Sequence, residues 1–101
     1  MRPPQSVAEF LDLVDQAIFE MDELAICANE DLDDETADLV QPFRSISGGL
    51  RQLHEQVGRG NHQFADGGDL PFMPLVRKYR HVIPIYRLLD LLNQAHRQGT
   101  A

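Results

Sequence analysis

Cysteine and lysine are almost absent from the sequence, with Cys27 and Lys78 the single examples in 101 residues. One cysteine excludes an internal disulfide framework and is typical of a reducing compartment. No apolar run approaches the roughly 20 residues that a bilayer-spanning helix needs. Residues 1–6 (MRPPQS) do not resemble a signal or transit peptide. We therefore expect a cytoplasmic protein with no membrane segment.

Basic charge is scarce in the first half of the chain. Residues 1–43 carry one basic and twelve acidic residues, whereas residues 44–101 carry eight basic and four acidic ones. The acidic and basic parts of the chain either pair with each other or present surfaces of opposite charge to partners. The segment VRKYRHVIPIYR, residues 76–87, could be a ridge that binds nucleic acid, but the net charge of −7 argues against it. The simplest interpretation is that Arg77, Arg80 and Arg87 meet the acids of the first helix, within or between chains.

The hydropathy pattern predicts three long helices and no strand. The first is expected over residues 6–30, with Ser6 as its N-cap and Glu9 completing a capping box. The second is expected over 36–58 and ends near Gly58 and Gly60. The third is expected over 74–98, kinked or split near Pro84. The fold class is therefore all-α, with residues 1–101 as a single helical domain.

A long connection, residues 58–74, joins the second and third helices. It is rich in glycine, asparagine, aspartate and proline, which are typical of loops. We expect its apolar side chains, Phe64, Leu70, Phe72 and Met73, to pin it to the bundle.

The acidic stretch NEDLDDETADLV, residues 29–40, raises the question of metal binding. A calcium loop that starts at Asn29 needs glycine at its sixth position and glutamate at its twelfth, but these are Asp34 and Val40. Starting at Asp31 fails at the same two positions. The stretch is better explained as a solvated linker in which Asp34 or Thr36 caps the second helix.

A magnesium site is the alternative that the carboxylates leave open. Glu20, Glu23 and Glu30 fall close together on one helical face, and Asp33 follows. Paired carboxylates hold magnesium in all-α nucleotide pyrophosphohydrolases, but there they come from facing helices. Here six residues separate the two pairs, so we favour a solvated acidic face with no metal. No catalytic residue and no cofactor is predicted, and Cys27 is expected to be a small buried filler.

An unusual apolar patch is predicted on the first helix. Phe19 and Ile26 lie nearly opposite its core stripe, and Leu13 and Cys27 extend the patch. The third helix is apolar around nearly its whole circumference between residues 82 and 92, which three helices cannot easily cover. A symmetric dimer would cover both, and so would complete the bundle. Gly48 and Gly49 indicate close packing or a hinge in the second helix, and we favour close packing.

These patterns predict a non-enzymatic helical module for protein–protein interaction or regulation, in the style of small bacterial cytoplasmic adaptors, regulators or secretion chaperones. Its partners would be a second copy of itself and another protein. Nucleic acid and membrane are not expected partners. The interaction surface would include Leu13, Phe19, Ile26, Gly48 and Gly49. The alternative is a magnesium-dependent, pyrophosphohydrolase-like enzyme that uses the carboxylates of the first helix.

Overall fold

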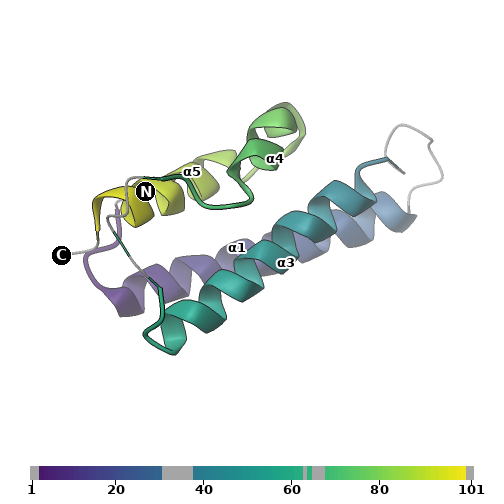
Figure 1. Cartoon of the computed structure of the whole chain (residues 1–101). Coiled ribbons are helices and arrows are strands. Elements are labelled where there is room, and N and C mark those ends of the chain that lie inside the picture. The colour runs from purple at the N-terminus through teal and green to yellow at the C-terminus, as the bar shows by residue number, and fades with distance from the viewer. Residues whose placement is uncertain (1–2, 31–37, 63, 65–67, 100–101) are drawn as a thin grey trace.

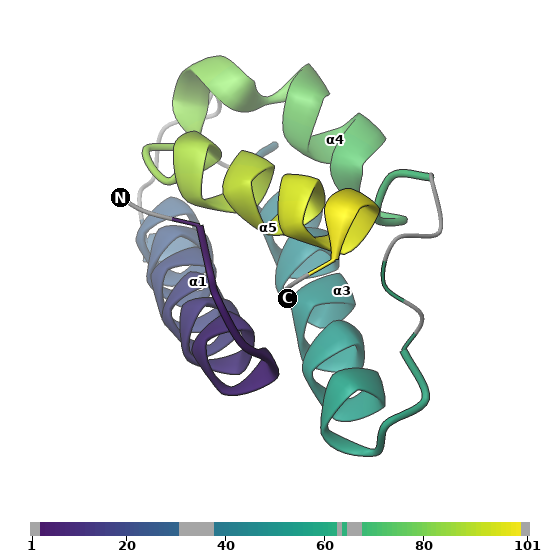
Figure 2. The same ribbon diagram turned by 90° about the vertical axis from the view of Figure 1, so that its left-hand side faces the viewer.

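A computed structural model describes residues 3–30, 38–62, 64 and 68–99, and every regular element among them is helical. The elements are α1 (Val7–Glu30), α3 (Val40–Gly58), α4 (Met73–Lys78), the 3-10 turn η1 (Arg80–Val82) and α5 (Tyr86–Gln98). Helices α1 and α3 form a long antiparallel hairpin (Figure 1), and α4 and α5 lie in a second layer across it (Figure 2). The predicted all-α class is confirmed for these residues. None of the described helices is long and apolar enough to span a membrane.

Helix α1 begins where the sequence predicts. The Ser6 hydroxyl accepts a hydrogen bond from the Glu9 backbone N–H at 3.1 Å. The Glu9 carboxylate accepts one from the backbone N–H of Gln5, rather than from that of Ser6 as in the usual capping box. Four positions of the predicted core stripe have no exposed surface, namely Phe10, Val14, Ala17 and Met21, whereas Val7 at its start is 43% exposed.

Helix α3 has no side-chain cap at its N-terminus but ends in a well-defined capping motif. Residues 38–39 form a turn and the helix begins at Val40, so the expected start at residue 36 and the expected caps, Asp34 and Thr36, lie outside the described residues. At the other end Gly60 adopts φ 74°, a conformation that glycine tolerates best. Its N–H donates to Val57 O at 3.1 Å, and the N–H of Asn61 donates to Gln56 O at 2.9 Å. These two bonds form a Schellman motif, which confirms the predicted role of Gly60.

The expected third helix, predicted to be kinked or split near Pro84, is split into α4, η1 and α5. Ile83, which precedes the proline, is extended at φ −107° and ψ 103°. A residue before proline is driven out of the helical region by contact with the proline ring, which explains the break.

The division also changes how the apolar residues of this segment are covered. Because the segment is not one straight helix, side chains from different sides of the expected helix reach the same core. Val76, Ile83 and Leu89 are all buried in the chain itself. The apolar circumference of the expected helix therefore no longer requires a second bundle to cover it.

The connection before α4 is pinned to the bundle as predicted. Leu70, Phe72 and Met73 are buried, and Phe64 packs edge-on against Phe10 of α1 with 5.0 Å between ring centroids. Phe72 lies so close to α3 that a Cβ on Gly49 would sit 2.8 Å from its Cδ1 atom. Close packing is thus confirmed at Gly49, although the neighbour is a residue just before α4 rather than another long helix. Helix α3 continues through both glycines, so they form no break in it.

Candidate functional site

An uncovered surface follows the α1–α3 hairpin. We call it the outer face and define it by Phe19, Ile26 and Gly48. Phe19 is 63% exposed and Ile26 is 49% exposed, and a side chain at Gly48 would meet nothing within 4 Å. Phe19 and Ile26 are seven residues apart and so lie on one side of α1, about 10 Å from each other along the helix axis. A hollow of about 460 Å³ adjoins Ile26, and it is lined by Asp22, Ala25, Ile26, Arg44, Ser47, Gly48 and Arg51.

The floor of this hollow is a polar cluster that joins α1 to α3. The buried Ser47 hydroxyl donates to the Asp22 carboxylate, and the Arg51 guanidinium binds both Asp22 and the Ser47 oxygen, the latter at 2.8 Å. Partial burial raises the pKa of Asp22, but the hydrogen bonds from Ser47 and Arg51 outweigh it, so the pKa lies below its ordinary value. The cluster therefore remains ionised at neutral pH and fixes the floor of the hollow.

Within the chain, two of the seven acids of α1 pair with α3, and Arg77 does not pair with α1 as expected. Asp22 meets Arg51, and Asp15 lies 3.0 Å from His54 Nε2. Arg77 instead binds Asp69, in the connection before α4. Because Pro84 separates α4 from α5, Arg77 on α4 and Arg97 on α5 both reach the Asp69 carboxylate.

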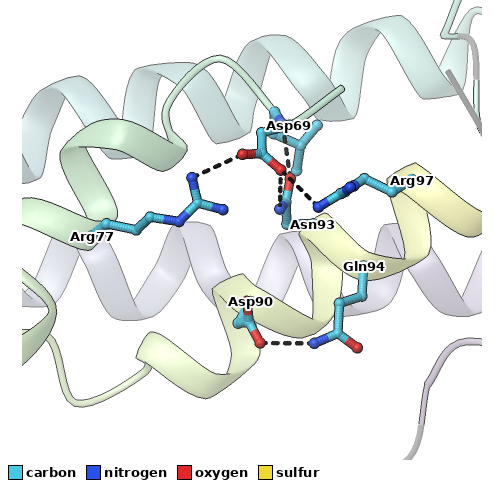
Figure 3. A network of polar contacts seen from close by, with 7 residues as sticks. Asp69, Arg77, Asp90, Asn93, Gln94 and Arg97 are labelled. Atoms are coloured by element: carbon cyan, nitrogen blue, oxygen red, sulfur yellow. Dashed lines mark hydrogen bonds and ion pairs between the residues drawn. The ribbon is translucent and has the colours of Figure 1, made fainter. Parts of the chain in front are cut away.

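Asp69 is the centre of a second polar cluster (Figure 3). Its carboxylate accepts hydrogen bonds from Arg77 Nη1 at 2.8 Å and from Asn93 Nδ2 at 2.9 Å, and Arg97 Nη1 lies 3.5 Å away. The buried Asn93 also accepts the backbone N–H of Leu70 at 2.8 Å. Hydrogen bonds from Arg77 and then Asn93 lower the pKa of Asp69 from 3.8 to about 2. The cluster ties the connection to α4 and α5.

A pocket of about 300 Å³ opens between α3, the connection and the end of α5. We call it the histidine pocket because two histidines, 34 residues apart, meet in it: His62 Nε2 lies 2.8 Å from His96 Nδ1. His62 also packs edge-on against Phe64. The remaining lining residues are Gly49, Gln52, Leu53, Gln56, Asn61, Asp69, Leu70, Pro71 and Phe72. Sequence analysis missed this pair because no local spacing joins the two histidines.

The structure brings together some of the predicted interaction residues. Phe19, Ile26 and Gly48 share the outer face, whereas Leu13 is half-buried against the core and Gly49 lines the histidine pocket. Cys27, expected to be a buried filler, is exposed.

The alternative magnesium site gains no support within the described residues. There, no three His, Cys, Asp or Glu side chains gather closely enough to hold a metal ion. Of the predicted ligands, Glu20 is half-buried, Glu23 and Glu30 are exposed, and Asp33 lies outside the described residues.

Comparison of the chain with protein-family models, with curated proteins and with solved structures gave no match.

Proposed function

We propose that the protein is a non-enzymatic, cytoplasmic interaction module that acts as a homodimer and associates through the outer face. The observation that carries the proposal is the exposure of Phe19 and Ile26 on one side of α1. Large apolar side chains that cluster on a surface are typical of protein–protein contacts. As a dimer, the module would present its remaining surfaces, including the histidine pocket, in two copies to a regulated partner.

The shape of the outer face suits a second helix. The hollow beside Ile26 is open at Gly48, where no side chain fills the space. A small residue lets a neighbouring helix approach closely, and an apolar side chain can enter such a gap as an anchor. Because the same surface carries both Ile26 and the gap at Gly48, Ile26 of each copy can fill the gap of the other copy across a two-fold axis.

Charge selects how the two copies would face each other. Helix α1 carries seven acidic residues and no basic one, whereas α3 carries Arg44, Arg51 and Glu55. Two α1 helices packed together would repel, but α1 packed on the partner's α3 brings opposite charges together.

A two-fold axis parallel to the hairpin produces this arrangement. Ile26 and Gly48 line the same hollow within one chain, so such an axis places Ile26 against the partner's Gly48. Glu23 or Glu30 would then lie near Arg44 of the other copy. We therefore infer that apolar anchors supply the affinity of the dimer, and that α1–α3 charge pairs set its orientation.

The experiment measures absolute molar mass by light scattering for the wild type and two variants. Phe19→Asp/Ile26→Asp places two charges at the proposed contact, and we expect it to be monomeric. Val7→Asp is the matched control, because Val7 is another exposed apolar residue of α1, at 43%, but lies at the start of the helix. It should retain the wild-type mass. Circular dichroism checks that both variants remain helical.

A charge reversal tests the orientation. Arg44→Glu should weaken the dimer, and Glu23→Arg/Glu30→Arg in the same chain should restore part of the affinity. A dimer that survives Phe19→Asp/Ile26→Asp would contradict the outer face as the contact. A dimer that Arg44→Glu strengthens would contradict the α1–α3 pairing.

A further inference from the structure

The contact between His62 and His96 joins the end of α3 to α5 through two titratable rings. His62 follows the Schellman motif of α3, and its Nε2 atom lies 2.8 Å from Nδ1 of His96 in the last turn of α5. The ring centroids are 4.8 Å apart. His96 is only 7% exposed and His62 is half-buried. The two rings are therefore in direct contact at a mostly buried position.

A hydrogen bond between two imidazole nitrogens carries a single hydrogen. Whichever ring donates it, the other ring must accept through a bare nitrogen, so the bond forms when both rings are neutral and also when one is protonated. When both rings are protonated, both facing nitrogens carry a hydrogen and neither can accept. Two like charges would then lie side by side at a mostly buried position, which is unfavourable. The contact therefore accommodates one added proton but not two.

The connection and α5 place one carboxylate and one guanidinium near the pair. Among the described residues, Asp69 is the one charged side chain that lines the histidine pocket besides the histidines themselves. Its carboxylate is bonded to Arg77 and lies 3.5 Å from Arg97, which follows His96 in α5. A carboxylate favours a proton on a nearby imidazole, but these two arginines offset that effect. The cluster therefore does not compensate two charges on the histidines.

The charged groups of α3 and α1 are engaged elsewhere. From α3 the pocket is lined by uncharged residues, and Arg59, the charged residue nearest to His62 in the sequence, pairs with Glu55. From α1, Glu9 is the acid next to Phe10, and its carboxylate accepts a backbone N–H before the helix. The second proton thus meets chiefly the charge of the first.

Aromatic contacts beside the pair depend on its geometry. His62 packs edge-on against Phe64 with centroids 4.7 Å apart, and Phe64 packs edge-on against Phe10 of α1. Phe10 has no exposed surface. The histidine contact therefore helps to hold Phe64 against a core residue of α1.

We propose that the His62–His96 contact is a pH-sensitive switch, closed while the pair holds at most one added proton and open when both imidazoles are protonated. An ordinary imidazole takes up its proton near about pH 6.5, and the second proton of an interacting pair binds at lower pH than the first. Because the open form holds one proton more than the closed form, its share should rise by up to about tenfold per pH unit as pH falls below about 6. The switch lies apart from the outer face, so it does not depend on the dimer.

The experiment follows the ¹⁵N-labelled full chain by NMR from about pH 7.5 to about pH 5, a range above the ordinary titration of carboxylates. Scalar coupling across the hydrogen bond between His62 Nε2 and His96 Nδ1 reports the closed contact directly. We expect this coupling at neutral pH and its loss near about pH 5, with the two imidazoles titrating in two separated steps. Because each imidazole is resolved, His54, which lies 3.0 Å from Asp15, is followed separately.

One variant and one control assign the effect to the pair. His62→Gln keeps a group that can donate or accept but cannot take a proton, so its Phe64–Phe10 ring contacts should persist down to about pH 5, where those of the wild type weaken. His81→Gln, at an exposed histidine of η1 outside the pocket, should behave as the wild type does.

Two results in the wild type alone would overturn the proposal, even if the variant fails to fold. They are a coupling that persists at about pH 5, and two imidazoles that titrate together in one step. Loss of the Phe64–Phe10 contacts in His62→Gln at the same pH as in the wild type would overturn it as well, because the second proton would then not be the cause.

Discussion

Replacing Gly49 by alanine tests the tight contact between α3 and Phe72. Alanine should raise helix stability by about 1 kcal/mol in the middle of a helix. Against this, the new Cβ would lie 2.8 Å from Phe72 Cδ1 and 3.4 Å from its Cβ and Cγ. Because three atoms of one buried side chain are this close, rotating the ring cannot relieve the contact. Overpacking of this kind typically destabilises by about 1–3 kcal/mol, so we expect Gly49→Ala to lower the unfolding free energy by about 1 kcal/mol.

Gly48 provides the matched control, one residue away on the same helix. A Cβ there meets nothing within 4 Å of its own chain, so Gly48→Ala should stabilise the chain by about 1 kcal/mol when both glycine variants are made in the monomeric Phe19→Asp/Ile26→Asp background, which keeps the proposed dimer contact at Gly48 out of the comparison. Urea unfolding followed by circular dichroism measures both variants, and each kcal/mol corresponds to a Tm shift of about 4–8 °C for a small domain. Adding Phe72→Leu to Gly49→Ala should cost less than the sum of the two single changes. Equal stabilisation by Gly48→Ala and Gly49→Ala would refute the packing argument.

Three further predictions concern polar contacts of the described residues. The pKa of Asp69 is about 2 when folded and 3.8 ordinarily, so its ionisation stabilises the fold above about pH 4 and this contribution is lost as pH falls toward 2. Asp69→Asn should therefore be less stable than the wild type in thermal melts at pH 7, and most of this gap should be lost by pH 2; a constant gap would contradict this. Asp22→Ala should destabilise by about 1 kcal/mol in urea unfolding, because the buried Ser47 hydroxyl loses its acceptor, whereas Asp12→Ala, at an exposed position of the same helix, should change little. Ser6→Ala should destabilise by about 1 kcal/mol through loss of the α1 cap, and Ser6→Asp should restore most of it; an unchanged Ser6→Ala melt would show that the cap contributes nothing.

The elements that the sequence predicts well are those set by neighbouring residues. The Ser6 cap, the α1 core stripe and the Gly60 end of α3 depend on contacts within a few residues, so spacing alone identifies them. The effect of Pro84 is also local, since the proline ring excludes Ile83 from the helical region. The spacing of apolar residues around Pro84 could not distinguish a kinked helix from a divided one, because the path of the chain there also depends on packing against α1 and α3.

The contacts that the sequence could not predict join distant residues. His62 and His96 are 34 positions apart, and Asp69 meets Asn93 and Arg97 at separations of 24 and 28. Both sets depend on how the connection crosses the end of α3. Within the chain Arg77 pairs with Asp69, eight residues earlier in the connection before α4, and not with α1 as expected. Exposure of Phe19 and Ile26, by contrast, followed from the helical period and is confirmed.

Absolute molar mass of the wild type, measured by light scattering at two protein concentrations, is the most direct test of dimerisation through the outer face. The chain has a mass of 11.4 kDa. Association through the outer face predicts about twice this value at both concentrations. A single-chain mass at both concentrations and at low salt would contradict the homodimer.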